Sequence, residues 1–551
     1  MISISVSIIS ASIAMAQSAT APSIEWQKTV GGADVDTLTA MCMSTDNASF
    51  VLCGASKSNQ SGRKSENRIG GYDYWVVKMD VAGNVLWNKT YGGTKNDVPG
   101  AVVALADGGY LVGGSSISDK SGSKSADAYG KSKDYWVVKL DVNGNKVWDK
   151  TYGGQFTENL TSLVELSSGK YVLGGYSYSN RKGETIKTSD NLGTPNTADY
   201  WMLVIDKNGK LLNQNVYGAT SMDDMTCMAA VSANSVYMGG FSYSVKLSGH
   251  KTTAPVGNDD VWMVRSDING NIQFQTGFGG SRSDFATCMQ YFTDKSFVIG
   301  GYSNSPADGN KSGAFLGVTD FYLIRTAANG NKLWDKSIGG AGGDYMTSVQ
   351  QTKDGGFILG GYSSSDKGND KTENSRGGYD YWIVKTDKNG NVLWEKTIGG
   401  KGDDKLTGIY EISADQFIVA GTSSSTVSGE KKNPPIGNSG AADYWVMRLS
   451  NTTTTANKVA EPVIASLATA QLSLIITPNP VRNAATIKYS IPAKADVTIY
   501  SAKGDAIIKA SLPAASAGVY SFDMTTFAKG TYYVVMRTGD GNKITKAFIK
   551  Q

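Results

Sequence analysis

The sequence predicts an all-β protein: a seven-bladed β-propeller of four-stranded blades, followed by a small C-terminal β-sandwich. Three observations lead to this fold: a repeat that occurs seven times, four strand-like segments in each repeat, and complementary ends of the array. The repeat is marked by an Asp, usually followed by two large apolar or aromatic residues, at positions 73, 134, 199, 260, 320, 380 and 443. A fixed period of this size indicates one unit that must stack on its neighbours to bury its apolar faces.

Each repeat contains four segments with the composition of β-strands. In the second repeat, residues 134–141 are aromatic and β-branched, and Asn143-Gly144 is a strong hairpin signal before a return strand at 146–153. A third segment covers 160–166, and a fourth covers 171–175 and ends in Gly-Gly. Helical periodicity does not occur in the unit. Four antiparallel strands, repeated seven times, are typical of a propeller.

The two ends of the array predict that the propeller is a closed ring. The ordered part begins at residues 24–28, a return strand without its hairpin partner, and the array ends at 443–448, a hairpin strand without its return. Pairing these two segments closes the ring and leaves no free sheet edge. The propeller is therefore expected to cover residues 23–451.

The tryptophans indicate how the blades pack. All eleven fall in two slots of the repeat: Trp75, Trp136, Trp201, Trp262, Trp382 and Trp445 in one, and Trp26, Trp87, Trp148, Trp334 and Trp394 in the other. A side chain needed in nearly every repeat favours packing between blades over ligand stacking. Asn213 occupies the second slot in one repeat, and we expect it to mark a weaker blade.

The composition argues against several functional classes. The formal charge of +4 on 551 residues is too small to indicate a nucleic-acid partner. His250 is the only histidine, which removes most Ser-His, Cys-His and His-ligated zinc chemistry, and no cofactor is expected. The four cysteines are expected to be buried thiols, although Cys42 and Cys53 flank one turn and a bridge between them stays open. Acids outside the repeated slots are scattered and form no pair suited to glycoside hydrolysis: Glu165, Glu184, Asp190 and Glu411.

One acid follows each return strand at a constant distance. A Gly-Gly or Gly-Ala pair and three further residues precede Asp36, Asp97, Glu158, Asp223, Asp284, Asp344 and Asp404. If the next strand lines the central channel, these acids form a ring that attracts cations, and calcium is the candidate because it prefers oxygen ligands. The alternative, which the sevenfold recurrence favours, is that each carboxylate caps the backbone amides of its own turn.

Seven long polar loops are expected on one face of the disc. They lie between the fourth segment of one unit and the next Asp of the repeat, and they are rich in Ser, Gly, Lys and Asn. Loops of this length commonly form binding sites. The alternative is that they form a solvent-exposed rim that only protects the fold. Several carry Gly-x-Lys-Ser/Thr, but a phosphate-binding loop is not supported, because its second Gly and its helix are missing. The candidate binding residues are one basic residue per loop: Lys64, Lys124, Lys187, His250, Lys311, Lys371 and Lys431.

The N-terminus predicts export. Residues 1–16 are apolar and end in Ala14-Met15-Ala16, which fits a signal peptide. An alternative end of this signal peptide is residue 22. The basic residues usual at the start of a signal peptide are missing, because none precedes Lys28. No later run is long and apolar enough for a transmembrane segment. After a linker at 452–472, short strands separated by glycines at 473–551 predict the sandwich.

This C-terminal region closely resembles the type A sorting domain of type IX secretion in Bacteroidetes. The resemblance rests on Pro478-Asn479-Pro480, Val497–Tyr500 running into Gly504, Ala517–Tyr520 with Gly518, Lys529–Tyr533 with Gly530, and Lys543–Lys550. It implies recognition by the type IX secretion machinery, passage across the outer membrane, and then attachment to the cell surface or release. The repeats resemble kelch-like propeller arrays, which implies a fold but no activity.

The function that we expect is therefore binding or adhesion. The preferred hypothesis is a secreted or cell-surface propeller that binds an extracellular protein or glycan through the long-loop face. The alternatives are an extracellular glycoside hydrolase or polysaccharide lyase on a propeller scaffold, and a purely structural surface component. The sequence favours a protein that is not an enzyme, because no catalytic pair emerges from it.

Overall fold

The computed structural model describes residues 20–451, except 184, 194–195, 245–247, 254–255 and 438–439, and residues 473–551, except 478–480, 482–483, 492–493, 502–504, 513–514 and 539–542. The chain divides into two compact units, Met1–Thr453 and Thr454–Gln551. The expected signal peptide lies almost wholly outside the described residues, and the expected linker lies wholly outside them.

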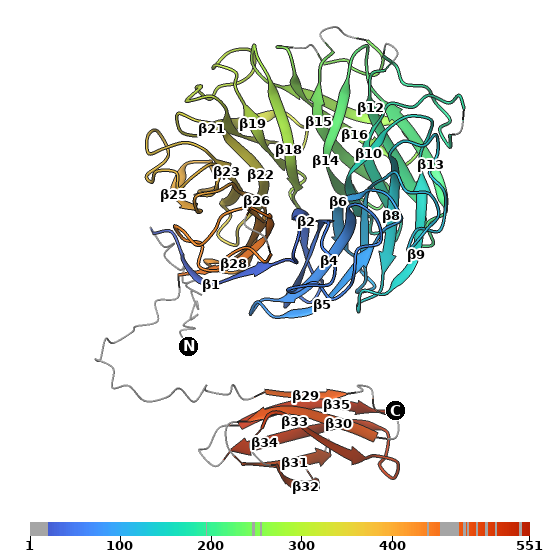
Figure 1. Ribbon diagram of the computed structural model, residues 1–551, viewed down its shortest axis with the longest axis vertical. Helices are drawn as coiled ribbons and strands as arrows, with labels where there is room; N and C mark the ends of the chain where they lie inside the picture. Colours follow the sequence, from blue (N-terminus) through green and yellow to red (C-terminus); the bar gives the residue numbers. More distant parts are fainter. Residues whose placement is uncertain are drawn as a thin grey trace, which may run out of the picture. The chain divides into compact units, whose positions relative to one another are not determined.

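The first unit is a ring of seven antiparallel four-stranded sheets, as predicted (Figure 1). Blade 1 contains β2 (Asp36–Met43), β3 (Ser49–Ser56), β4 (Asp73–Asp80) and β5 (Val85–Tyr91). Blade 2 contains β6 (Asp97–Ala104), β7 (Tyr110–Ser116), β8 (Asp134–Leu140) and β9 (Lys146–Tyr152). Blade 3 contains β10 (Glu158–Glu165), β11 (Tyr171–Ser177), β12 (Asp199–Ile205) and β13 (Leu211–Tyr217). Blade 4 contains β14 (Asp223–Ser232), β15 (Ser235–Ser242), β16 (Asp260–Asp267) and β17 (Ile272–Phe278).

The remaining blades repeat the same order. Blade 5 contains β18 (Asp284–Tyr291), β19 (Phe297–Ser303), β20 (Asp320–Thr326) and β21 (Lys332–Ile338). Blade 6 contains β22 (Asp344–Gln351), β23 (Phe357–Ser363), β24 (Asp380–Thr386) and β25 (Val392–Ile398). Blade 7 contains β26 (Asp404–Ser413), β27 (Gln416–Ser423), β28 (Asp443–Ser450) and, from the other end of the chain, β1 (Ser23–Val30).

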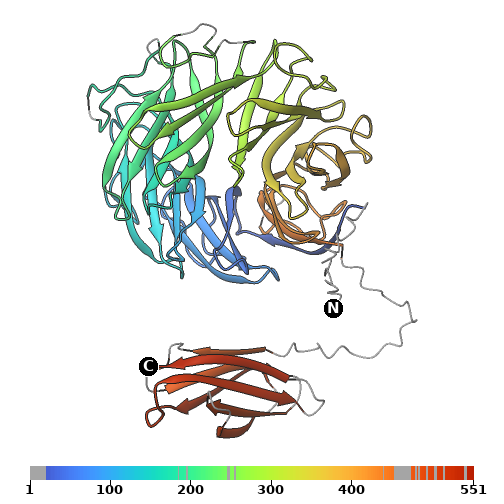
Figure 2. The same ribbon diagram turned by 180° about the vertical axis from the view of Figure 1, so that it is seen from behind.

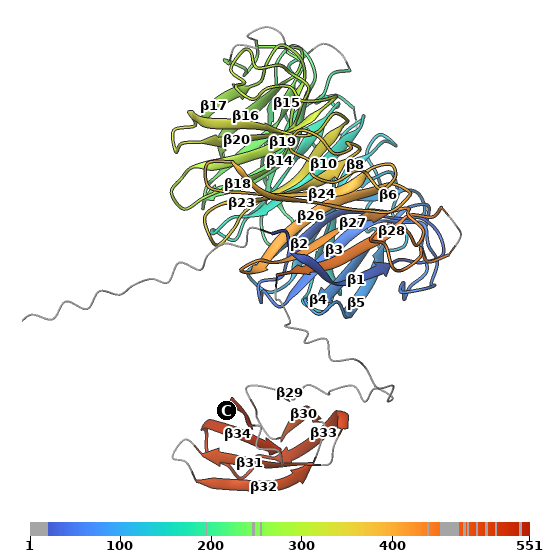
Figure 3. The ribbon, with the colours of Figure 1, turned by 90° about the vertical axis from the view of Figure 1, so that its left-hand side faces the viewer.

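The ring closes in the predicted way. Strand β1 pairs with β28 over the whole length of β1, from Ser23 opposite Ser450 to Val30 opposite Tyr444. The blue β1 and the orange β28 lie side by side in Figure 1 and again in Figure 3, and Figure 2 shows the same closure from behind. The first and last strands of the propeller therefore complete one sheet, and both ends of the ring are held by backbone hydrogen bonds.

Neighbouring blades are joined by an aromatic pair, which confirms the structural role predicted for the first tryptophan slot. Tyr74 packs on Trp136 of the next blade with ring centroids 4.8 Å apart, and its hydroxyl donates to the Trp136 carbonyl oxygen. At the closure Tyr444 packs on Trp75 in the same way, with centroids 4.9 Å apart. These tryptophans are fully buried.

The second slot packs against the hairpin turn of the following blade. The indole N–H of Trp87 donates to the carbonyl oxygen of Val142, 3.1 Å away, and the ring lies against Gly144 of the same turn. Gly144 has a φ of 79°, as a turn of this type requires. Asn213 keeps the equivalent bond, from its Nδ2 to the Ile268 carbonyl oxygen at 2.8 Å, but lacks the ring. All four cysteines are free, and all but Cys288 are fully buried.

The second unit is a small β domain of two sheets. One contains β29 (Ser473–Thr477), β30 (Ala484–Ile491) and β33 (Ala515–Asp523), and the other contains β32 (Ala506–Leu512), β31 (Ala495–Ser501), β34 (Gly530–Thr538) and β35 (Lys543–Lys550). Of the expected sorting-motif residues, Gly518 lies in β33 and Gly530 begins β34, whereas Pro478, Asn479, Pro480 and Gly504 lie outside the described residues. None of the described segments forms a helix of the length and apolarity needed to cross a membrane.

Candidate functional site: the loop face of the propeller

The seven acids that follow the Gly-Gly pairs cap their own turns. Asp97 is fully buried at the start of β6, and its Oδ2 accepts the backbone N–H of Gly93 at 2.7 Å and the hydroxyl of Ser118 at 2.9 Å. The bond from the backbone amide recurs in every blade, at 2.6–2.8 Å. The capping role that the sequence favoured is confirmed. The acids do form a ring, but it is buried between the blades.

A second ring of carboxyl groups lies beside the first. In each blade the capping acid, a serine and the repeat-marking Asp are cross-strand neighbours, for example Asp97, Ser116 and Asp134. The backbone N–H of Asp97 donates to the Tyr72 carbonyl oxygen, so Asp97 also adjoins Asp73 of the preceding blade. The Asp of each blade therefore meets the capping acid of the next. The seven pairs are Asp443 with Asp36, Asp73 with Asp97, Asp134 with Glu158, Asp199 with Asp223, Asp260 with Asp284, Asp320 with Asp344, and Asp380 with Asp404.

The Gly-Gly pairs are required by this arrangement. A Cβ on Gly92 would lie 1.8 Å from Oδ1 of Asp73, so only glycine leaves room for that carboxyl group. The next residue, Gly93, supplies the amide that caps Asp97. At the Asp260–Asp284 interface, the point where a Cβ of Gly279 would lie is 2.4 Å from Oδ1 of Asp260 and 2.7 Å from Oδ2 of Asp284. Each first glycine therefore marks the place where two carboxyl groups meet.

One lysine from each long loop is buried beside these acids. Lys187 is 5% exposed, and its ammonium group donates to Oγ of Ser177 at 3.0 Å and to the Ser179 carbonyl oxygen at 2.6 Å. It also lies over the ring of Trp201, 5.6 Å from the centroid. Burial lowers the pKa of Lys64, Lys187 and Lys431 to about 8 each, while nearby carboxylates oppose that shift. The loops are thus anchored in the blades.

The seven candidate binding residues do not all occupy the same position of the repeat. In blade 4 the buried lysine is Lys251, whereas His250 is held by its backbone N–H, which donates to the Gly218 carbonyl oxygen. The same backbone bond is made in blade 1 by Arg63, the residue before Lys64, so Lys251 occupies the repeated position. The other six are the buried lysines themselves: Lys64, Lys124, Lys187, Lys311, Lys371 and Lys431. Ligand binding by them stays a prediction, and a ligand would have to displace the loops to reach them.

The charged residues do not gather into an obvious metal centre. Within the ranges that the structure describes, no group of three or more His, Cys, Asp or Glu side chains is placed to hold a metal ion. The unrepeated acids are also apart: Glu165 and Glu411 each accept a backbone amide from the turn of a neighbouring blade, at 2.7 Å, and Asp190 pairs with Arg181. Glu184 lies outside the described residues.

A ring of threonines joins the first strands of the blades. The Thr347 hydroxyl donates to the carbonyl oxygen of Leu406 in the next blade at 2.8 Å. Equivalent bonds at 2.7–3.1 Å are made by Thr161, Thr226, Thr287 and Thr407. Blade 2 has Gly100 at this position. These hydroxyls hold neighbouring blades together.

An unbroken chain of aromatic rings covers blades 4–6 on the loop face, next to the capping acids. We call it the aromatic arc; adjacent rings have centroids 4.8–5.9 Å apart, and its members are Phe241, Tyr243, Phe285, Tyr302, Tyr345, Tyr362 and Tyr379. Every member is half-buried, so part of each ring is open to solvent. The ammonium group of Lys405 lies over Tyr379 and Tyr362 at one end, 4.9 and 5.7 Å from their centroids.

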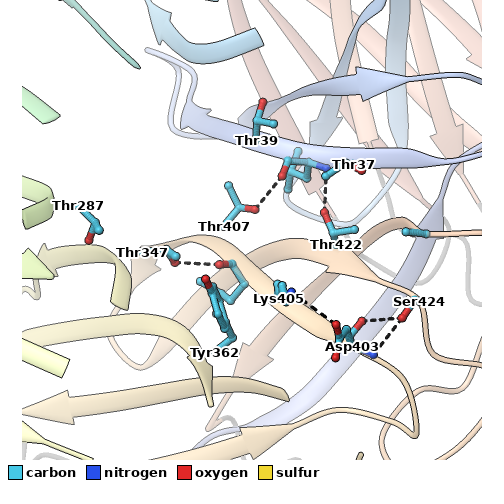
Figure 4. Close-up of a pocket in the computed structure, with 13 residues that line it drawn as sticks. Thr37, Thr39, Thr287, Thr347, Tyr362, Asp403, Lys405, Thr407, Thr422 and Ser424 are labelled. Carbon is cyan, nitrogen blue, oxygen red and sulfur yellow. Dashed lines mark hydrogen bonds and ion pairs between the residues drawn. The ribbon is translucent and has the colours of Figure 1, made fainter. Parts of the chain in front are cut away.

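A cavity of about 560 Å³ adjoins this end of the arc (Figure 4). Tyr362 of the arc and Lys405, which lies over the arc, both line the cavity, and Thr287, Thr347 and Thr407 line it from the threonine ring. In Figure 4, Asp403 lies between Lys405 and Ser424, and Thr422 accepts a bond from the Leu38 amide. The lining therefore combines threonine and serine hydroxyls with apolar surface, one aromatic ring and one pair of opposite charges, which suits a ligand that has both polar and apolar faces.

The arc was not predicted from the sequence. Its residues occupy positions whose amino acid differs from one repeat to the next. The second residue of the first strand is Thr37, Val98, Asn159 and Asp224 in blades 1–4, Phe285 and Tyr345 in blades 5 and 6, and Lys405 in blade 7. The second-to-last residue of the next strand is aromatic only in blades 3–6. Superposing the repeats and asking which positions vary would have found it.

The fold and the C-terminal domain together define an exported propeller protein. Residues 476–551 match the family described as the secretion system C-terminal sorting domain. The chain therefore carries the sorting domain of type IX secretion, and the protein is secreted across the outer membrane, to the cell surface or into the medium.

The propeller is similar to several distantly related proteins. The regulatory protein FlaEY of Caulobacter vibrioides is 23% identical over 445 residues, which cover 73% of this chain and 45% of that protein. The chain thus spans less than half of the length of this curated relative. Among solved structures, the extracellular domain of a hybrid two-component system from B. thetaiotaomicron has 9% identity and a TM-score of 0.37, over 95% of this chain and 57% of that one. A DUF4221 family member from Bacteroides vulgatus has 9% identity and a TM-score of 0.32, over 78% and 97%.

Proposed function

We propose that the protein is a secreted or cell-surface binding propeller that holds an extracellular glycan or protein on its loop face. The observation that carries the proposal is the aromatic arc. Seven half-exposed rings gathered over three blades are not required by the fold, because blades 1, 2 and 7 have small, polar or charged residues at most of the same positions. Aromatic surface left in contact with solvent is characteristic of interaction sites.

The neighbouring cavity favours a glycan over a flat protein surface. Tyrosine rings present an apolar face and a hydroxyl rim, and the cavity beside Tyr362 adds threonine and serine hydroxyls, Lys405 and Asp403. A sugar offers apolar C–H faces and many hydroxyls, so it matches both kinds of surface. A chain of sugars can lie along the arc and place one unit in the cavity.

The direct test is a binding array of glycans and extracellular-matrix proteins, probed with the full chain. After a hit is found, the variant Tyr345→Ala/Tyr362→Ala is expected to bind about tenfold more weakly or worse, because it removes two adjacent aromatic anchors. The matched control is Leu333→Ala, which removes a 59% exposed apolar side chain from the outer strand β21. Unchanged binding by the double variant would contradict the proposed site.

The long loops are a poorer target for this test. Shortening a loop also removes its buried lysine and the serines that contact the carboxyl groups, so a loss of binding would be confused with a loss of stability. A parallel array with a calcium chelator tests whether a cation takes part in binding. Turnover of a polysaccharide on the array would instead favour the enzyme hypothesis, and self-association without a foreign ligand would favour a structural role.

A further inference from the structure

The buried charges on the loop face form a closed ring with unequal numbers of each sign. It contains the seven pairs of carboxyl groups and seven lysines: Lys64, Lys124, Lys187, Lys251, Lys311, Lys371 and Lys431. No acid in the ring is more than 3% exposed, and no lysine more than 5%. If every group were ionised, each blade would carry two negative charges and one positive charge, all shielded from water.

Such an imbalance is strongly unfavourable. A buried charge without a partner costs several kcal/mol even after the protein relaxes, and the usual response is that the group changes its protonation state. One additional positive charge at each of the seven interfaces would make the ring neutral. This positive charge must fit between the two buried carboxyl groups of each interface.

The carboxyl oxygens indicate a missing hydrogen-bond donor. Within the described residues, twelve of the fourteen acids have a buried Oδ1 without a hydrogen-bond partner. They are all seven repeat-marking acids and five capping acids, and each of these five also has a serine hydroxyl beside it. An ionised carboxylate only accepts hydrogen bonds, so two of them side by side cannot satisfy one another. A protonated carboxyl group is a donor, and it supplies the bond that both lack.

We propose that each blade interface binds one proton, shared between its two carboxyl groups, so that the buried ring is neutral in the folded propeller. The step is a simple protonation: one carboxylate of the pair takes up H⁺ from solvent, and the resulting O–H donates to the carboxylate of the other acid. The propeller is then a protein that takes up about seven protons as it folds near pH 5, where unfolded aspartates are ionised.

The interface between blades 1 and 2 illustrates the surroundings of one proton. Oδ2 of Asp73 accepts the backbone N–H groups of Ile69 and Gly70, and Oδ2 of Asp97 accepts those of Gly93 and the Ser118 hydroxyl. The charged or titratable groups that face the pair are Lys64, Lys124 and Tyr74. Both Oδ2 atoms therefore accept hydrogen bonds and Ser116 lies beside Asp97, so Oδ1 of Asp73 remains for the proton.

The pKa values of these acids agree with the arrangement. Burial raises the pKa of Asp73 to about 6, of Asp443 to about 7, and of Asp134 and Asp199 to about 8, and the neighbouring carboxyl group adds to each shift. An unfolded aspartate titrates near 4, so between about pH 4 and pH 8 the folded chain binds more protons than the unfolded chain. The contribution of the ring to stability is therefore fully present below about pH 4 and is lost as the pH rises through 6 to 8.

Infrared spectroscopy of the full chain near pH 5 tests the proposal directly, because a neutral carboxyl group has a C=O stretching band that an ionised one lacks. We expect a band equivalent to about seven buried neutral carboxyl groups, which disappears as the pH is raised above about 8. The melting temperature should fall over the same pH range. These two measurements on the wild-type protein need no variant to fold.

A triple variant locates the protons. The variant replaces one acid at each of three interfaces with an amide that donates to the remaining carboxylate: Asp73→Asn, Asp199→Asn and Asp443→Asn. The intensity of the infrared band should therefore fall by about three sevenths. The control is Asp107→Asn, which removes a half-exposed acid paired with Lys139 outside the ring and should leave the band unchanged. Absence of the band in the wild type, or finding one tightly bound metal ion per interface by mass spectrometry, would overturn the proposal. Neither outcome depends on whether the arc binds a glycan.

Discussion

The loop face carries two sets of residues that follow opposite rules. The buried charge ring has the same three parts in all seven blades, a capping acid, an Asp and a lysine, although these parts come from segments far apart in each repeat. The aromatic arc occupies equivalent positions only in blades 4–6, and blades 1, 2 and 7 have mostly small, polar or charged residues there. This difference indicates that a position repeated in every blade maintains the closed propeller, whereas a position that departs from the repeat can contribute to ligand binding.

Removing a lysine from the buried charge ring tests whether the repeated residues stabilise the fold, and it should have the largest effect. Lys64→Met keeps the length of the side chain but leaves Asp36 and Asp73 without their cation, and the folded protein should lose roughly 3–5 kcal/mol of unfolding free energy. Denaturant unfolding followed by tryptophan fluorescence measures the change. The control is Lys401→Met, because Lys401 is an exposed lysine in the connection between β25 and β26. Equal stability of both variants would show that the repeated lysine does not hold the fold.

The threonine ring combines both kinds of position, because its bonds between blades recur in five of the seven blades and some of its members also line the cavity. Thr347→Val removes a hydroxyl that donates to Leu406 in the next blade at 2.8 Å, while keeping the shape of the side chain. We expect about 1 kcal/mol of lost stability and little change in ligand binding. If binding weakened and stability did not change, repetition would not be a reliable guide to structural residues on this face.

Much of the fold could be predicted because its signals are local. The Asn-Gly turns, the tryptophan slots and the complementary segments at 24–28 and 443–448 each lie within one short stretch of sequence. The buried charge ring could not be predicted, because it brings together a loop and the starts of two strands from neighbouring blades. Lys64 in a loop rich in Ser and Gly has the appearance of an exposed residue, and only the packing over Trp75 shows that it is buried.

The interface between blades 3 and 4 offers the one test that should raise stability, since it departs from a repeated position without gaining a function. Elsewhere a tryptophan or Phe274 covers the glycine of the next hairpin turn, but here Asn215 lies against Gly270 and its Nδ2 has no partner. The double variant Asn213→Trp/Asn215→Lys restores the residues that blade 2 has at Trp148 and Lys150, and the indole N–H can replace the bond to Ile268. Burying part of the ring should add roughly 1–2 kcal/mol of stability, measured by the denaturant midpoint.

The reciprocal change is the control for this last prediction. Trp148→Asn gives the interface between blades 2 and 3 the side chain that blade 3 has, and it should lower stability by a similar amount, because the bond to Lys207 can be kept while the ring is lost. A gain from the first variant and a matching loss from the second would assign the cost to the missing ring alone. If Trp148→Asn lowered stability but the double variant did not raise it, the residues of blades 3 and 4 would already be packed around Asn213. The interface between these blades would then be as stable as the others.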